Sequence, residues 1–261
     1  MRRSMEAVIL SPFAEIVYNS IICHKGQKRK MSSDNSASNF FQDIFPPRRI
    51  KVLGAGRFGR LAAERLKRLF PDSRLSITDR DAARVDAVAA DLGIPGEVEE
   101  RIWNADSIEP ADDLWLVPAV PVHVGFEWAV NELSRVGEVR RLAVPKEVDS
   151  EVPNPIRVAE GTVYASFATF VCPDYCSEPE EICTHTGKER PGNLYDVFGA
   201  ILVPGFDVAV LRSWQLAPGV GGYPGRRLRE LIARIGSKPG RYLVATSCRC
   251  HGVMDALEWG T

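Results

Sequence analysis

The hydrophobic residues beyond position 49 form two kinds of pattern, which alternate along the chain. Short apolar or alternating runs, typical of strands, occur at residues 50–53, 75–78, 114–120, 141–144, 162–171, 206–211 and 241–246. Apolar residues spaced three or four apart predict helices at residues 62–70, 82–92, 125–136, 194–201 and 226–235. A further short strand is expected near residues 101–103, and the glycine-rich stretch 215–222 is expected to be an irregular turn. The alternation predicts an α/β fold with a doubly wound, mostly parallel sheet.

A glycine motif lies between the first predicted strand and the first predicted helix. The apolar run 50–53 leads directly into Gly54, and Gly56 and Gly59 complete a G-x-G-x-x-G. In such a motif the first glycine permits a tight turn, the second lets the backbone approach a pyrophosphate, and the third lets the helix pack against the strand. The spacing alone also fits an ordinary turn. Its place between a strand and an amphipathic helix predicts a dinucleotide-binding site.

The second predicted strand ends at Asp79, about 20 residues beyond the motif. A carboxylate there accepts hydrogen bonds from the adenosine ribose and repels the 2′-phosphate of NADP, so Asp79 favours NAD. The adjacent Arg80 weakens this preference, because a guanidinium pairs well with a phosphate. We therefore expect NAD as cofactor, with NADP as the second choice. The expected cofactor contacts are Gly54, Gly56, Arg57, Phe58, Gly59, Asp79, Arg80 and Pro121.

Two candidate proton-transfer residues follow later strands. The buried-strand pattern at 114–120 leads into Pro121, two residues before His123. This segment resembles the fourth strand of several NAD-dependent dehydrogenases, in which an Ala-Val-Pro turn lies beside the nicotinamide. The resemblance makes His123 a candidate acid or base, and the alternative is a structural histidine at a helix start. Lys146 follows the strand 141–144, where some of those enzymes place a lysine acid, and the alternative is an exposed loop lysine.

Residues 49–150 as a whole resemble NAD(P)-binding Rossmann domains of two groups. One group is the saccharopine- or glycerol-phosphate-type dehydrogenases, and the other is the N-terminal nucleotide-binding domain of potassium-uptake regulators. Both are matched by Gly54, Gly56, Gly59 and Asp79. The first implies an oxidoreductase that acts on a small-molecule substrate or a redox partner. The second implies a regulatory module that senses NAD(H), although nothing here clearly corresponds to the regulators' small ligand-sensing domain. A metal- or redox-sensing binding protein without turnover is a third alternative.

The composition is that of a globular protein, with no electrostatic reason to bind nucleic acid. Hydrophobic residues make up 45% and charged residues 26% of the 261 residues, and the net charge is −1. Such a chain has no general attraction for nucleic acid or for an anionic membrane. No apolar run reaches the roughly 18 residues that a membrane span needs. We expect a cytoplasmic protein that neither inserts into membranes nor binds nucleic acid, and we leave homo-oligomer formation open.

The composition also divides the chain into three expected segments. A disordered or non-native arm is expected at residues 1–48, because a basic cluster and the small polar run 31–38 cannot bury enough surface to fold. Met31 is a candidate start of the native protein. A dinucleotide-binding domain is then expected at residues 49–150 and an α/β extension at residues 151–261.

Most of the cysteines fall in two groups in this extension. The first group opens a polar loop without apolar periodicity and the second follows the strand at 241–246; they are Cys172, Cys176 and Cys183, and Cys248 and Cys250. If the strands preceding both groups ran parallel to the first strand, the groups would meet at the edge where the dinucleotide binds. Cys172, Cys176 and Cys183 with Cys248 or Cys250 would then supply four thiolates, which suit Zn²⁺ or an iron–sulfur cluster, with His185 and His251 in reserve. We expect such a centre to hold the polar loop, which nothing else in the sequence anchors. Catalytic or redox-active thiols, and unliganded cysteines or disulfides, are the alternatives.

Overall fold

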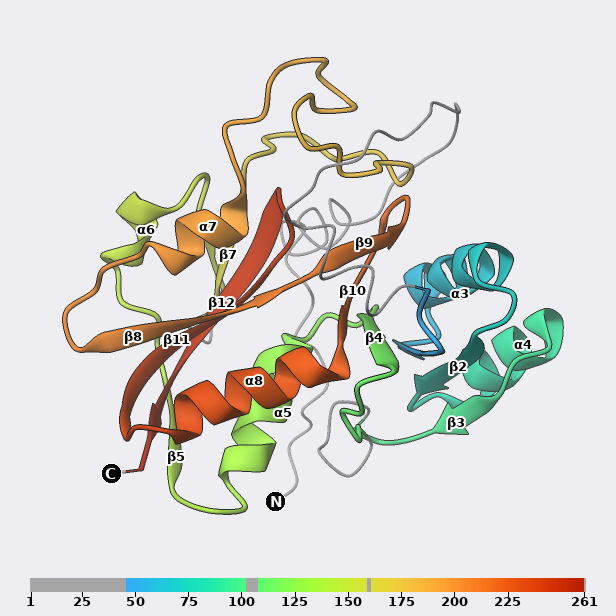
Figure 1. The fold of residues 1–261 in the computed structure, drawn as a ribbon, viewed down its shortest axis with the longest axis horizontal. Helices are drawn as coiled ribbons and strands as arrows, with labels where there is room; N and C mark the ends of the chain where they lie inside the picture. The colour runs from blue at the N-terminus through green and yellow to red at the C-terminus, as the bar shows by residue number, and fades with distance from the viewer. Residues whose placement is uncertain (1–45, 102–107, 159–160, 261) are drawn as a thin grey trace, which may run out of the picture.

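The computed structural model describes residues 46–101, 108–158 and 161–260. Within these residues the chain forms two six-stranded sheets that lie side by side, with helices on their faces (Figure 1). The arm predicted at residues 1–48 lies outside the described residues up to residue 45, as does most of the strand predicted near residues 101–103.

The first sheet contains the predicted glycine motif. Its strands, in order across the sheet, are β3 (Gly96–Val98), β2 (Arg74–Asp79), β1 (Arg49–Leu53), β4 (Leu114–Pro118), β10 (Val220–Pro224) and β9 (Trp214–Ala217). The first four are parallel, so β2, β1 and β4 have their carboxyl ends at one edge. The hairpin β9–β10 then joins β4 in the antiparallel direction.

Two helices pack on this sheet as their apolar spacing predicts. Helix α3 (Arg57–Leu69) buries Ala62, Ala63 and Leu66 against the sheet. Helix α4 (Ala82–Leu92) begins after Asp81, whose side chain accepts a hydrogen bond from the Arg84 amide. It ends at Gly93, which has a left-handed φ of 57° that a glycine adopts without strain.

The second sheet is mainly antiparallel. Its strands, in order, are β6 (Ile156–Arg157), β7 (Val163–Ser166), β12 (His251–Trp259), β11 (Gly240–Ser247) and β8 (Phe206–Arg212), and β5 (Val139–Leu142) pairs with β12 beyond β7. The pair β8–β11 is the parallel one. Strand β11 is apolar on both faces, because Leu243 and Ala245 belong to one core and Tyr242 and Val244 to another.

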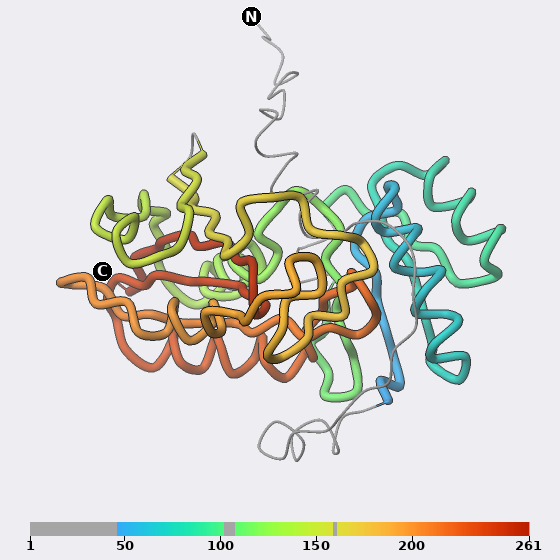
Figure 2. The backbone as a smooth tube through the Cα atoms, turned by 90° about the horizontal axis from the view of Figure 1, so that it is seen from above, coloured from blue at the N-terminus to red at the C-terminus, as the bar shows by residue number. Residues whose placement is uncertain are grey.

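Helices cover both faces of this second sheet. Helices α5 (Val124–Leu133) and α8 (Gly225–Gly236) pack on one face, and α7 (Leu194–Gly199) packs on the other (Figure 1). The short α6 (Val148–Glu151) adds Val148 to the core that α7 covers. A loop of residues 167–193 extends from β7 towards the first sheet (Figure 2).

Most of the predicted helices and strands are confirmed, but the predicted doubly wound, mostly parallel sheet is wrong. Both sheets are mixed, and the described residues contain only the six helices α3 to α8. The prediction failed at residues 215–222, which form most of the β9–β10 hairpin rather than an irregular turn. A Cβ at Gly222 would lie 2.7 Å from the Leu116 carbonyl oxygen, so the glycine permits close strand packing.

A second error concerns the end of the chain. The strand predicted at 241–246 is not the last one, because β12 follows it and runs antiparallel to it. Strand β12 also pairs with β5 and β7, so these segments build a second sheet instead of extending the first. The strand predicted at 162–171 is shorter than expected, since β7 ends at Ser166.

The fold requires a glycine at position 59 but not at position 56. An added Cβ at Gly59 would lie 1.7 Å from the Gly54 carbonyl oxygen, whereas no atom lies within 4 Å of one at Gly56. We expect Gly59→Ala to lower the free energy of unfolding by at least about 2 kcal/mol, because the turn and α3 must separate. Gly56→Ala should change it by less than about 1 kcal/mol. Urea denaturation measures both, and equal losses would contradict this account of the turn.

Candidate functional site

The glycine turn is held against the end of β4. Gly54 has a φ of 110°, and a Cβ there would lie 2.6 Å from the Ala119 carbonyl oxygen. The Ala119 amide in turn donates to the Leu53 carbonyl oxygen at 2.7 Å. On its outer side the turn is open at Gly56, where α3 begins. The first amides of α3 therefore lie at an open surface at the carboxyl edge of the parallel strands.

Asp79 stabilises this turn from the neighbouring strand. Its Oδ2 accepts a hydrogen bond from the Ala55 amide at 2.6 Å, and its Oδ1 accepts one from the Asp81 amide at 3.0 Å. The residue is 8% exposed. Each carboxylate oxygen has a second lone pair, so Asp79 retains acceptor capacity towards a hydroxyl at this edge. Arg80, which follows it, is exposed.

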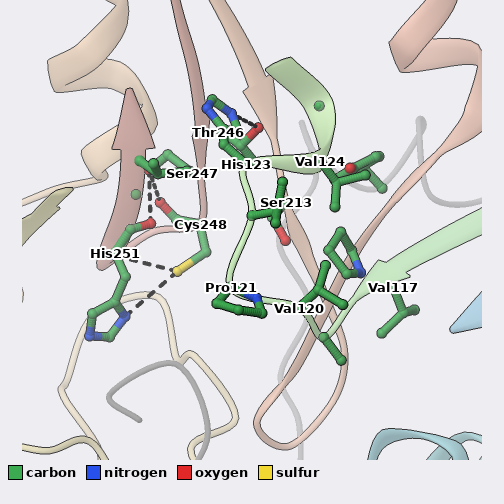
Figure 3. A pocket seen from close by; sticks show the side chains of 18 of the residues that line it. Val117, Val120, Pro121, His123, Val124, Ser213, Thr246, Ser247, Cys248 and His251 are labelled. Carbon is green, nitrogen blue, oxygen red and sulfur yellow. Dashed lines mark hydrogen bonds between the residues drawn. The ribbon is translucent and has the colours of Figure 1, made fainter. Parts of the chain in front are cut away.

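A cavity of about 150 Å³ lies between the carboxyl end of β4 and the adjacent ends of β11 and β12 (Figure 3). It reaches the turn contact itself, since Ala119, which Gly54 approaches, lines it. None of its described lining residues is Lys, Arg, Asp or Glu. The polar or titratable side chains among them are those of His123, Tyr164, Ser213, Tyr223, Thr246, Ser247, Cys248 and His251.

His123 is held from both sides by residues of the second sheet. Its Nδ1 lies 2.8 Å from Asp255 Oδ2, and its Nε2 lies 2.8 Å from Thr246 Oγ1 (Figure 3 draws the second contact). Asp255 also accepts a hydrogen bond from the Thr162 hydroxyl. The ring is buried and stacks on Phe126 with the centroids 5.8 Å apart. The predicted proton-transfer residue is therefore an oriented imidazole that bonds to a hydroxyl in the cavity wall.

The Asp255 carboxyl is ionised at neutral pH. Burial would raise its pKa, but hydrogen bonds from His123 and Thr162 and the positive charge of Arg141 bring the pKa below its ordinary value. An ionised carboxylate at Nδ1 fixes the proton of a neutral imidazole on that nitrogen. Nε2 is then the acceptor for the Thr246 hydroxyl.

Tyr223 gives the cavity a polar group without a partner. The residue is 1% exposed, lines the cavity, and its hydroxyl makes no hydrogen bond to any described residue. Burial raises its pKa well above the ordinary value, so the hydroxyl remains protonated. A buried hydroxyl costs free energy unless something bonds to it, and a polar atom of a cavity occupant would do so.

The other predicted site residues are divided between the turn, the cavity and the surface. Pro121 lines the cavity, and the Arg57 guanidinium lies 5.4 Å from the Phe58 ring centroid beside the open turn. Lys146 is exposed and is absent from the described cavity lining. It follows β5, which belongs to the second sheet, so the position does not correspond to the edge where β1 and β4 end.

Three residues that the sequence analysis missed complete the site. Thr246 and Asp255 orient His123, and Tyr223 supplies the unpaired hydroxyl. Asp255 is a charged residue within the otherwise apolar run 253–257, which indicates a buried partner. That partner, His123, is 132 residues away in the sequence. Thr246 and Tyr223 have no comparable local signal.

Two of the cysteines contact His251, next to the cavity. All five in the described residues are free thiols. Cys172 Sγ lies 3.4 Å from His251 Nε2, and Cys248 Sγ lies 3.9 Å from His251 Nδ1. Cys248 and His251 both line the cavity (Figure 3). Of the second cysteine group, the described cavity lining therefore contains Cys248 but not Cys250.

The cysteine loop is anchored without a metal ion, contrary to the expectation that nothing else holds it. The Arg65 guanidinium of α3 bonds to the Asp174 carbonyl oxygen, and the Gln215 side chain donates to the Cys176 carbonyl oxygen at 2.6 Å. The Gly219 amide donates to the same carbonyl oxygen at 2.9 Å. In the part of the chain that the structure describes, no three His, Cys, Asp or Glu side chains are gathered as a bound ion requires.

The titration of these groups weighs against a reactive thiolate. Burial raises the pKa of the Cys248 thiol, and it raises that of Cys250 to about 11. Burial and the nearby Arg190 lower the pKa of His251 to about 4. Without a bound cation the two thiols and the imidazole are therefore neutral at pH 7, which is not the state of an activated nucleophile.

Comparisons with known proteins identify the family. A family model described as "Uncharacterized protein, C-terminal domain" matches residues 125–260, which include all but the first residue of α5, helices α6 to α8 and every strand of the second sheet. The chain belongs to this family. A relative from Archaeoglobus fulgidus, described as "Uncharacterized protein", is 30% identical over 231 residues, covering 79% of this chain and 98% of the relative. No solved structure shows a significant match.

None of the helices in the described residues is long and apolar enough to cross a membrane.

The Asp255–His123 pair predicts a pH dependence of stability. A carboxyl whose folded-state pKa lies below its unfolded value of about 3.9 stabilises the fold above that pH, and the contribution is lost as the pH falls through the folded-state pKa. We expect Asp255→Asn to lower the free energy of unfolding at pH 7 by about 1–3 kcal/mol. The difference from the unmodified protein should narrow below about pH 4.

Urea denaturation between pH 7 and pH 3 measures this difference. Asp207→Asn is the matched control, because Asp207 pairs with Lys238 at an exposed position and should show little loss at any pH. A difference for Asp255→Asn that stays constant down to pH 3 would contradict the linkage.

Proposed function

We propose that the protein binds NAD(H), or as the second choice NADP(H), at the carboxyl edge of β2, β1 and β4, and that it is an oxidoreductase. The observation that carries the proposal is the contact between the glycine turn and the end of β4. The turn has an open outer face, and the ring-sized cavity begins at Ala119, the residue that Gly54 approaches. In a bound dinucleotide, the pyrophosphate would lie on the turn and the nicotinamide in the cavity.

The turn offers the groups that a pyrophosphate needs. A Cβ at Gly56 would meet no atom within 4 Å, so the backbone is accessible there. The amides that open α3 have no partners within the helix, and the positive end of the helix dipole favours an anion. Arg57, the first helical residue, is exposed and adds a positive charge.

Asp79 is placed to choose between the two nicotinamide cofactors. Its carboxylate lies beside the turn, where it would accept hydrogen bonds from ribose hydroxyls and repel a 2′-phosphate. Arg80 is the exposed residue next to it and would favour a phosphate. The direct bond of Asp79 to the turn supports NAD as the preferred cofactor.

The cavity has the size and chemistry of a site for one nicotinamide ring. Apolar cavities of about 150 Å³ admit a benzene-sized molecule. The described lining is largely apolar, and the Tyr223 hydroxyl would donate to the carboxamide oxygen of a bound ring. The nicotinamide supplies a hydride donor or acceptor when bound.

The chain's own proton-transfer group is His123. Its Nε2 bonds to the Thr246 hydroxyl, which lines the cavity, and its Nδ1 bonds to the ionised Asp255. A proton from a reacting hydroxyl would pass to Thr246 and then to Nε2, while Asp255 stabilises the resulting imidazolium. The arrangement suits a reaction between a hydroxyl and a carbonyl group.

A sensor of NAD(H) is the alternative, and one observation favours it. The cavity is walled by both sheets, with Ala119 from the end of β4 and Cys248 and Val253 from the turn and strand of the second sheet. A ring bound there would contact both sheets at once, so its charge state would affect how they pack. The sensor and the enzyme are distinguished by turnover.

The first functional prediction concerns the open face of the turn. Gly56→Val should lower the affinity for NADH at least about 10-fold, because the side chain occupies the space that a pyrophosphate would fill, a loss of about 1.4 kcal/mol. Its free energy of unfolding should change by less than about 1 kcal/mol. The measurements are a fluorescence titration with NADH and urea denaturation.

The control for this variant is Gly199→Val, which also meets no atom within 4 Å but lies in α7 of the second sheet. It should leave the affinity for NADH unchanged. If Gly56→Val binds NADH as tightly as the unmodified protein does, the dinucleotide site is wrong. A stronger affinity for NADPH than for NADH in the unmodified protein would show that Arg80 outweighs Asp79.

The second functional prediction concerns the proton path. His123→Gln should lower the turnover of NADH with carbonyl, imine or electron-accepting substrates about 100-fold, because the general base is lost. The dissociation constant for NADH should change less than about threefold. Lys146→Ala is the matched control, and it should leave turnover unchanged because Lys146 is exposed and lies outside the cavity lining.

Full turnover in His123→Gln would contradict the catalytic role. Binding of NADH without turnover of any tested substrate, together with a difference in hydrogen exchange between the NAD- and NADH-bound forms, would support the sensor instead.

A further inference from the structure

Three side chains from different elements form one hydrogen-bonded chain at the cavity wall. Thr246 of β11 bonds to His123 Nε2, and Asp255 of β12 bonds to His123 Nδ1, each at 2.8 Å. Thr246 lies opposite Val253, and Asp255 lies two residues beyond Val253 on the same strand. Thr246 and Asp255 are therefore diagonal neighbours on one face of the antiparallel pair. Helix α5 covers that face, and His123, directly before its first residue, bridges the two side chains.

The direction of these hydrogen bonds makes Thr246 the hydroxyl that can lose a proton. The ionised Asp255 holds the imidazole proton on Nδ1, so the lone pair of Nε2 faces the Thr246 hydroxyl. Asp255 is itself fixed by the hydroxyl of Thr162. A hydroxyl bonded to an imidazole whose other nitrogen bonds to a carboxylate is the arrangement that activates a serine nucleophile, and a threonine hydroxyl can undergo the same chemistry.

The Thr246 hydroxyl is also accessible to a molecule in the cavity. Thr246 is partly exposed and lines the cavity, whereas the His123 ring behind it is buried (Figure 3). The base is therefore shielded and the nucleophile is not.

A second hydroxyl, that of Tyr223, lies close to Thr246. A Cβ added at Gly125 would lie 3.0 Å from Thr246 Oγ1 and 3.9 Å from the Tyr223 hydroxyl oxygen, so the two hydroxyls border one small space. The Tyr223 hydroxyl is buried and makes no hydrogen bond to any described residue. Gly125 lies in the first turn of α5, where amides have no partner within the helix. A carbonyl oxygen that gains negative charge would be stabilised by these donors.

We propose that Thr246 is the nucleophile of an esterase site, in which His123 is the general base and Tyr223 binds the oxyanion. The ester is small and uncharged, because the cavity admits a benzene-sized group and none of its described lining residues is Lys, Arg, Asp or Glu. The reaction needs no nucleotide and therefore goes beyond the proposed oxidoreductase. The cavity has room for the acyl group or for a nicotinamide ring, so the two would exclude each other.

The reaction has two balanced steps. Thr246 Oγ1 bonds to the acyl carbon as its proton moves to His123 Nε2, and the carbonyl oxygen takes the negative charge beside Tyr223. The bond to the leaving alcohol then breaks and this alcohol takes the proton from His123, which leaves Thr246 acylated. Water attacks the acyl group in the same way, which releases a carboxylic acid and restores the Thr246 hydroxyl.

The first test detects the acylated protein, with the full chain and no nucleotide. p-Nitrophenyl acetate should release an initial burst of about one equivalent of p-nitrophenol, because p-nitrophenol leaves more readily than the threonine hydroxyl does. Mass spectrometry of the acid-quenched protein should locate an acetyl group on Thr246. The proposal is overturned if no burst occurs, or if acetyl groups are found only on other residues, such as Cys248 or lysines.

The second test assigns the roles. Thr246→Val, which replaces the hydroxyl by a methyl group, should abolish the burst, whereas Thr246→Ser should retain it. His123→Gln and Tyr223→Phe should each slow the burst about 100-fold. Thr186→Val is the matched control and should leave the burst unchanged, because Thr186 is exposed and lies outside the described cavity lining.

Urea denaturation shows whether each variant is folded. Tyr223→Phe removes a hydroxyl that bonds to no described residue, so it should be as stable as the unmodified protein and tests the site even if a Thr246 variant does not fold. An unchanged burst in Thr246→Val would overturn the proposal, and an unchanged burst in Tyr223→Phe would overturn the oxyanion assignment.

NADH binding is measured on the same samples to separate this inference from the proposed function. A protein that binds NADH but forms no acetyl-Thr246 refutes the esterase site alone. Acetyl-Thr246 in a protein that does not bind NADH supports the esterase site and refutes the nucleotide site.

Discussion

The two hydrogen bonds of His123 are the interaction on which the proposed site depends. The residue follows the last strand of the parallel part of the first sheet, whereas both partners, Thr246 and Asp255, belong to the central strands of the second sheet. The His123 side chain is 5% exposed and that of Asp255 13%, so water has little access to the bond between them. The two bonds set the distance between the end of β4 and the ends of β11 and β12, and the cavity is the space that this distance leaves.

The local parts of the site could be predicted from the sequence. Strand β1, the turn at Gly54 and helix α3 follow from a short apolar run, the glycine spacing and an apolar stripe, all within about 20 residues. The close contacts at Gly54 and Gly59 confirm that these glycines are needed for packing. Periodicity indicates which residues face a core, but it does not indicate which sheet a strand joins.

The remaining parts depend on contacts between distant segments, which local patterns do not encode. The glycines at 221 and 222 predicted a turn. In the structure Gly222 is a strand residue, and its lack of a side chain lets β10 approach β4. Asp255 and Tyr223 reach the site because β12 pairs with β5 and β7, and β10 with β4, all far from them along the chain. The cysteine loop read as unsupported for the same reason, since its anchors Arg65 and Gln215 lie in other elements.

Helix α8 has a consequence for how the protein unfolds. Its residue Leu228 belongs to the core of the first sheet, while Leu231 and Ile235, one and two turns later, belong to the core of the second. Neither sheet can lose its packing without exposing part of the same helix, so the free energy of opening one is coupled to that of the other. The two sheets are therefore one cooperative unit, and a cavity between them keeps its shape for as long as the whole molecule is folded.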